Sequence, residues 1–271
     1  MKILFVTIFF ILVLCNGCEF ATHQAATVPP KFLSKAPEKR ITNSIGMEFV
    51  LIPEGVFTMG SSKGVNREKP LHQVNISQPF YLQTTKVTQG QWEKIMGDHS
   101  SYYKDRMKCG EDCPVETVSW YDAKEFIERL NAIENTDQYR LPYEAEWEYA
   151  CMAGRDSEYS FEESSNLGNE YDWCCKEVRL SNKRIATREP NSWGLYEMRG
   201  ATIQEFLEDD YHANYQGAPD QGFAWVDNPR GSTRVKRGGS DCKWFVRSGF
   251  PPDTRSSSVG FRLAKSVFLD P

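Results

Sequence analysis

The sequence predicts an α+β domain with a large share of irregular chain. Short apolar segments with strand character occur before residue 77 and after residue 193, and two segments between residues 119 and 154 have apolar residues at helical spacing. Between residues 156 and 190 the chain is rich in Gly, Asn, Ser and Glu and shows neither period. Strands on both sides of a helical block are typical of α+β architecture.

Several short segments have the composition of strands. Residues 47–53 and 55–60 predict two strands around a tight turn, and residues 71–76 predict a third. In the second half of the chain the apolar segments are shorter. They predict strands at residues 194–196, 203–207, 233–237 and 260–264.

Two helices are predicted between the early and the late strands. Apolar residues within 120–130 recur at helical spacing, with Ser119 in the N-cap position and Asp122 in the first turn. A second helix is predicted to start at Pro142, where a missing N–H costs nothing, and to end at Gly154. The first of these helices is amphipathic and is expected to pack on an apolar surface.

The composition limits the functional classes. The chain has 271 residues, of which 40% are hydrophobic and 13% aromatic, which is enough for a sizeable core. Its net charge is -5, and no run of Lys and Arg is interleaved with aromatic residues. We therefore expect no nucleic acid among its partners.

The N-terminus predicts export. Lys2 precedes an apolar run at residues 3–14, which is too short to span a bilayer. A Gly directly before Cys18 resembles a bacterial lipoprotein signal, in which Cys18 carries the lipid; plain secretion is the alternative. Residues 1–18 are thus a predicted signal peptide and residues 19–41, which lack apolar periodicity, a flexible tether. The expected location is the outer membrane or cell surface, with the lipid as membrane anchor.

Export also predicts how the cysteines are used. In an oxidising compartment, Cys109 and Cys113 form the most plausible disulfide, because they lie close together in a Gly/Glu/Asp loop. A zinc site is a weaker alternative, because histidines are scarce and no second cysteine pair has ligand spacing.

A segment without regular pattern lies between residues 240 and 259, and Gly, Pro, Ser and Asp predict that most of it is loop. Yet it contains Trp244, Phe245 and Phe250, which a merely solvated loop has little reason to carry. Aromatic side chains held by rigid strands are typical of a recognition surface. The alternative is that these rings fill the local core.

Several stretches together resemble the formylglycine-generating enzyme and sulfatase-modifying-factor family. They occur in the family's order and imply its elaborated C-type-lectin-like fold over residues 42–265. The stretches are FVLIPEG at 49–55, FTMG at 57–60, PVETVSW at 114–120, YRLP at 139–142, EAEWEYA at 144–150, PNSWGLYEM at 190–198, RGGS at 237–240 and GFRL at 260–263.

The resemblance implies the fold and not the activity. Oxygen-dependent members bind copper through a cysteine pair shortly after the RGGS turn, which needs two thiolates near one soft metal. In this chain only Cys242 follows the turn. We therefore expect no enzymatic activity and no required cofactor. The alternative is a degenerate copper-dependent oxidase that uses Cys242 with Cys174 or Cys175.

Calcium is another ligand that the resemblance implies. The carboxylates of Glu197 and Glu205, with backbone carbonyls of Gly200 and Thr202, are the predicted ligands of a possible structural calcium ion. The alternative is that Glu205 is buried and satisfied by backbone amides.

The tail also resembles the variable proteins of diversity-generating retroelements, which imply a diversified ligand-binding region at about residues 237–262. Most residues of this segment are reachable from mutagenised Asn codons, although Lys243 and Trp244 are not. The implied partner is an unknown protein or surface ligand; a fixed envelope lipoprotein with a structural or assembly role is the alternative. The predicted ligand-binding residues are Asp241, Cys242, Trp244, Phe245, Ser248, Gly249, Phe250, Thr254, Ser256, Ser257 and Ser258.

Overall fold

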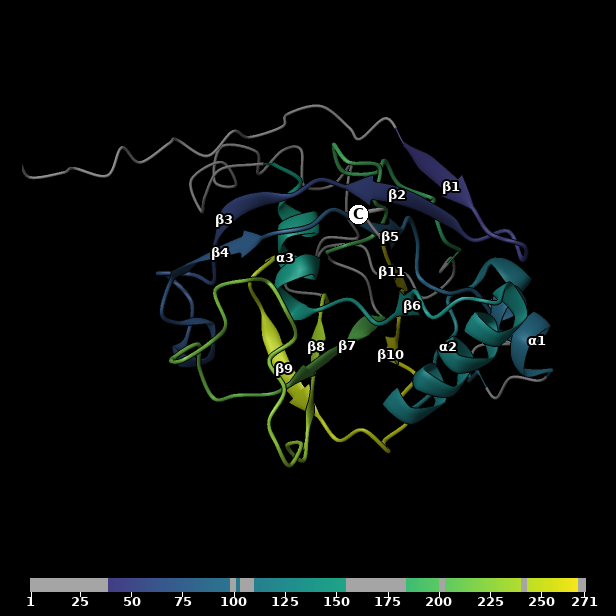
Figure 1. Cartoon of the computed structure of the whole chain (residues 1–271). Helices are drawn as coiled ribbons and strands as arrows, with labels where there is room; N and C mark the ends of the chain where they lie inside the picture. Colours follow the sequence, from purple (N-terminus) through teal and green to yellow (C-terminus); the bar gives the residue numbers. More distant parts are fainter. Residues whose placement is uncertain are drawn as a thin grey trace, which may run out of the picture.

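A computed structural model describes residues 39–97, 101–102, 110–154, 184–199, 203–239 and 243–267. Within these ranges the chain forms three sheets, with α-helices packed against them (Figure 1). No helix in the described ranges is both long enough and apolar enough to cross a bilayer. The architecture is α+β, as the sequence predicts.

A five-stranded antiparallel sheet joins the two ends of the described chain. Its centre is strand β5, whose four residues are all buried. The first strand, β1, crosses the predicted boundary between tether and domain. In spatial order the strands are β1 (Arg40–Thr42), β2 (Glu48–Ile52), β5 (Phe80–Gln83), β11 (Ala264–Ser266) and β6 (Tyr139–Arg140).

The strands predicted at residues 47–60 and 71–76 are confirmed, but their pairing differs from a simple hairpin. Strand β2 pairs with β1 and β5, whereas β3 (Gly55–Met59) pairs with β4 (His72–Ile76) in a separate two-stranded sheet. The tight turn at Pro53 therefore connects the five-stranded sheet to the two-stranded sheet.

Helix α2 (Trp120–Glu134) is confirmed together with its cap. The Ser119 hydroxyl accepts from Asp122 N, and the Asp122 carboxylate accepts from Ser119 N, which makes a reciprocal capping box. The apolar face of α2 packs against the shorter helix α1 (Gln89–Met96), where Trp92 stacks on Phe126 with ring centroids 5.4 Å apart.

Helix α3 (Glu144–Met152) starts two residues after Pro142, with Tyr143 in the N-cap position. Every residue of α3 is buried, because the helix lies between the β3–β4 hairpin and strand β7 (Figure 1). Its three glutamates are therefore inside the protein. Buried carboxylates need partners. The C-terminal strands supply them for Glu144 and Glu148, whereas Arg140 of β6 pairs with Glu146.

The four-stranded sheet carries most of the C-terminal chain. Its order is β10 (Val259–Gly260), β7 (Gln204–Asp210), β8 (Arg234–Arg237) and β9 (Arg247–Phe250), with β10 parallel to β7. The prediction that residues 241–258 are mostly loop holds for the described residues, except for the four-residue strand β9. Its pairing with β8 over four residues overrides a local composition that disfavours strands.

Two strand predictions need correction. Residues 194–196 form no strand, because Gly194 has a φ of +80° and the Asn191 side chain accepts from the Leu195 backbone in a turn. The single strand predicted at residues 260–264 is two short strands, β10 and β11, in different sheets. Two 3-10 helices, η1 (Asn66–Glu68) and η2 (Gly110–Asp112), complete the described elements.

Candidate ligand-binding surface

The C-terminal segment, residues 237–262, runs from the end of β8 through β9 to β10. The connection from β9 to β10, residues 251–258, passes the N-terminal end of α2 (Figure 1). Backbone hydrogen bonds hold it there, because Trp120 N donates to Pro252 O and Thr117 N donates to Ser256 O, each at 3.0 Å. The connection is irregular in pattern but attached to the scaffold at several points.

Arg237 attaches the first end of the C-terminal segment to α3. Its guanidinium, 0% exposed, forms ion pairs with Glu144 at 2.7 Å and with Glu148. It also donates to the carbonyl oxygen of Trp244, seven residues along the same segment. One buried cation thus holds both the scaffold helix and the chain after the RGGS turn.

Arg247 attaches the middle of the segment. Its Nε and Nη2 donate to the two carboxylate oxygens of Glu144 at 2.7 and 2.8 Å, and its Nη1 donates to the carbonyls of Arg67 and His212. Burial alone would raise the pKa of Glu144, but Arg247 and Arg237 lower it below its usual value. Glu144 is therefore a carboxylate shared by two buried arginines.

Arg262 attaches the last end of the segment to β7. Its Nε and Nη2 donate to the two oxygens of Glu205 at 2.7 and 2.9 Å, and Lys86 Nζ lies 3.2 Å from the same carboxylate. Trp147 Nε1 donates a further hydrogen bond to Glu205 at 3.1 Å. Burial would raise the pKa of Glu205, but Arg262 and Lys86 hold it below its usual value.

These contacts disfavour the predicted calcium ligands, which stay a prediction. The Glu205 carboxylate already pairs with two cations, so it does not fit a calcium site. The alternative, in which backbone amides satisfy Glu205, also differs from the structure, because its partners are side chains. Glu197 accepts from Thr187 N, and its own carbonyl accepts from Lys86. In the described ranges no group of three or more His, Cys, Asp or Glu side chains could hold a metal ion. Gly200 and Thr202 lie outside those ranges.

Asp209 joins the N-terminus of α3 to the connection between β7 and β8. Its carboxylate oxygens accept from Glu144 N and from Trp225 N, each at 2.7 Å. Burial, followed by the nearby Glu144 carboxylate, raises the pKa of Asp209 to about 8. Between about pH 4 and pH 8 the folded state therefore holds a proton that the unfolded chain has released, and the contribution of Asp209 to stability falls as the pH rises.

The variant Asp209→Asn removes this titration. We expect the free energy of unfolding of the wild type, relative to the variant, to fall by about 4 kcal/mol between about pH 5 and pH 8. Denaturant titrations of both proteins across this range measure the difference. A difference that stays constant with pH would contradict the raised pKa.

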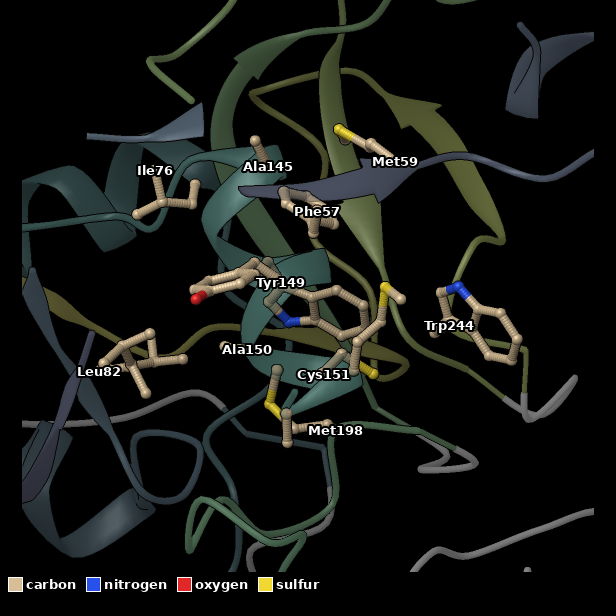
Figure 2. Close-up of a cluster of buried hydrophobic side chains, with 14 of the residues drawn as sticks. Phe57, Met59, Ile76, Leu82, Ala145, Tyr149, Ala150, Cys151, Met198 and Trp244 are labelled. Carbon is tan, nitrogen blue, oxygen red and sulfur yellow. The ribbon is translucent and has the colours of Figure 1, made fainter. Parts of the chain in front are cut away.

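The structure corrects the predicted roles of two aromatic residues. Trp244 and Phe245 are each 8% exposed and belong to the core cluster that also contains Met198 and Cys151 (Figure 2). Their rings meet edge to face, with centroids 5.4 Å apart. Trp244 and Phe245 therefore fill the local core, which is the alternative stated from the sequence, and they are not exposed anchors for a ligand. Trp244 lies at the edge of the cluster drawn in Figure 2.

Phe250 and the hydroxyl residues of the segment are more accessible. Ser248 and Phe250 are partly buried on β9, and Thr254, Ser256, Ser257 and Ser258 are partly buried on the connection that follows. The Ser256 and Ser258 hydroxyls hydrogen-bond to each other at 2.9 Å. Six of the predicted ligand-binding residues are thus partly accessible within residues 248–258. Asp241 and Cys242 lie outside the described residues.

Gly249 has a packing role that the sequence did not indicate. A Cβ at this position would lie 2.8 Å from the Tyr211 ring and 3.2 Å from the Thr233 hydroxyl, so a larger residue requires Tyr211 to move. Gly249 therefore lets β9 approach the neighbouring chain closely, and it does not present a side chain.

The predicted covalent sites are only partly described. Cys113 is buried and disulfide-bonded, while Cys109 lies outside the described residues, so their pairing stays a prediction. Cys18, the predicted lipidation site, also lies outside them, as do Cys174 and Cys175.

Sequence reasoning missed the residues that fix the segment: Glu144 and Glu148 on α3, and Arg247 on β9. One signal was present, because Glu144 and Glu148 are four residues apart in the predicted helix and so lie on one face of it. Acidic residues on one face of a buried helix indicate cationic partners elsewhere in the chain.

The fold and the C-terminal segment define the class of protein. Residues 34–267 match the family model of the sulfatase-modifying factor enzyme 1-like domain, and the chain belongs to this family. Its C-type-lectin-like architecture is shared with solved relatives. Treponema denticola variable protein 1 is 25% identical, with a TM-score of 0.72 over 84% of this chain and 98% of that one.

Two sequence relatives have different functions. The chaperone protein LppX of Paenibacillus barcinonensis is 25% identical and covers 72% of this chain and 79% of LppX. The formylglycine-generating enzyme of Streptomyces coelicolor is 24% identical and covers 90% of this chain and 97% of the enzyme. The family thus contains proteins named as enzymes and proteins that are not, and membership alone does not define an activity.

Proposed function

We propose that this protein is a non-catalytic, ligand-binding protein whose C-terminal segment carries the binding surface. One observation carries the proposal: three buried arginines fix the segment, while Ser248, Phe250 and the side chains of 254–258 remain accessible between them. A rigid support with accessible hydroxyls and one aromatic ring suits recognition, because little conformational entropy is lost on binding. Asp241 and Cys242 are assigned to the same surface from the sequence.

We place the protein in the cell envelope. The proposal is a lipoprotein anchored through Cys18, with residues 19–41 as a tether, at the outer membrane or cell surface. An exported anchor and a binding surface at the other end of the chain suit a ligand that is a protein or a surface molecule outside the cell.

Diversification of the segment by a retroelement is the finer part of the proposal. Its support is the similarity to Treponema denticola variable protein 1 and the division of the segment into buried and accessible positions. Sequencing the DNA beside the gene tests it. We expect a reverse transcriptase gene and a repeat of the codons for residues 237–262 that differs at adenines.

If neither the gene nor the repeat is present, a fixed envelope lipoprotein with a structural or assembly role becomes the better proposal, and the similarity to LppX favours that reading. An oxidase stays the third candidate because of the similarity to the Streptomyces enzyme. Copper binding that depends on Cys242 would support it and would contradict a purely non-catalytic role.

A further inference from the structure

One face of the four-stranded sheet brings accessible residues of three strands together. Lys236 on β8 lies directly opposite Phe206 on β7 and Ser248 on β9 in the strand register. Phe250 follows Ser248 by two residues and so lies on the same face. Phe206 is buried, while the other three residues are partly accessible. The face thus carries a lysine and a hydroxyl beside two aromatic rings, one of them buried.

Lys236 is partly buried on this face and, like Lys265 on another sheet, lies over an aromatic ring. Its Nζ lies 4.5 Å from the centre of the Phe250 ring, and no carboxylate of the described residues lies within ion-pair distance of it. By contrast, Lys86 and Lys124 have carboxylate oxygens at 3.2 and 3.0 Å. Burial lowers the pKa of Lys236, and no neighbouring anion offsets this effect.

We propose that Lys236 binds an acidic side chain of a partner protein. An Asp or Glu carboxylate of the partner pairs with Nζ, its methylene groups pack against the edge of Phe250, and the Ser248 hydroxyl is in position to donate to the same carboxylate. The inference rests on the proposed function, because it names the chemistry of the ligand at that surface. A partner carboxylate would supply the anion that no described residue of the chain supplies to Lys236.

The ring contacts favour a protein over a glycan or a nucleic acid. Sugars and nucleobases bind aromatic residues by stacking on an open ring face. Lys236 lies over a face of Phe250, and Phe206 packs against the same ring with centroids 5.8 Å apart. An acidic side chain needs only the ammonium group and the ring edge, and Lys236 and Phe250 are each partly exposed.

Short random peptides displayed on phage and selected on the purified protein test the inference. We expect the selected peptides to be enriched in Asp and Glu, and Lys236→Gln to weaken binding of a synthetic peptide by about tenfold. Replacing the peptide's acidic residue by its amide should cost the same factor, and the two losses should not add, since they remove one interaction. Lys236→Met serves as a second variant, and circular dichroism checks that each is folded.

Lys265→Gln is the matched control. Lys265 also lies over an aromatic ring, 4.9 Å from the centre of Tyr139, but on the five-stranded sheet. Its loss should leave peptide affinity unchanged. The inference would be overturned if the selected peptides lack acidic residues and their binding survives Lys236→Gln but not Phe250→Ala. That result would leave the proposed binding surface in place. Peptides unaffected by substitution of Lys236, Ser248 and Phe250 would overturn both.

Discussion

Replacing Arg237 with alanine is expected to lower the free energy of unfolding by about 3–5 kcal/mol. Arg237 is fully buried and pairs with Glu144 and Glu148. Glu144 keeps Arg247 after the substitution, but Glu148 loses its ion pair inside the protein and retains the backbone N–H of Gly60. The penalty comes from leaving the Glu148 carboxylate buried without its ion-pair partner. It also includes the loss of the hydrogen bond from Arg237 to the Trp244 carbonyl.

Equilibrium unfolding in denaturant measures this loss. The control is Arg129→Ala, since Arg129 pairs with Glu125 on the exposed face of α2, and its loss should cost about 0.5 kcal/mol or less. Arg237→Lys keeps the charge but not the forked geometry, and its stability should lie between the wild type and Arg237→Ala. Equal losses for the two alanine variants would contradict the anchoring role of Arg237.

Glu205→Gln is the second substitution with a large expected effect. It removes the carboxylate shared by Arg262 and Lys86. The two buried cations then keep carbonyl partners, with the Glu197 carboxylate nearby, but lose their ion pairs with residue 205. We expect a loss of about 3–5 kcal/mol, and partial deprotonation of Lys86, whose pKa burial already lowers.

Thermal unfolding with and without calcium measures this effect. The same experiment tests whether Glu205 is a calcium ligand. Glu208→Gln is the control on the same strand, because Glu208 is more exposed and pairs with Lys124 and Arg230 near the surface. It should cost about 1 kcal/mol or less. We expect that neither a chelator nor added calcium changes the difference in melting temperature between the wild type and Glu205→Gln. A calcium-dependent increase that Glu205→Gln abolishes would show that Glu205 is a calcium ligand.

Local patterns in the sequence predicted the elements that local interactions define. Helix α2 has its cap, its first-turn acid and its apolar face within sixteen residues, 119–134, so each feature is visible without knowing the fold. Strands β2, β3 and β4 also follow from their own composition. Strand β9 does not, since it depends on a pairing with β8 that no local pattern shows.

The sequence predicted the ends of the C-terminal segment but not how the segment is held. The RGGS and GFRL stretches marked the ends of the C-terminal segment, and the structure attaches both ends through Arg237 and Arg262. Composition could not show which aromatic rings between them are buried. Burial of Trp244 and Phe245 depends on residues of α3 and the 193–198 turn, which are more than forty positions away in sequence.

The central claim is that the C-terminal segment combines fixed, buried positions with replaceable, accessible ones. Sequencing the gene across many isolates tests this claim most directly. We expect substitutions at Ser248, Phe250, Thr254 and Ser256 to Ser258, at positions that match template adenines, and none at Arg237, Arg247 or Arg262. An unchanging segment, or substitutions spread equally over the buried arginines, would contradict the account.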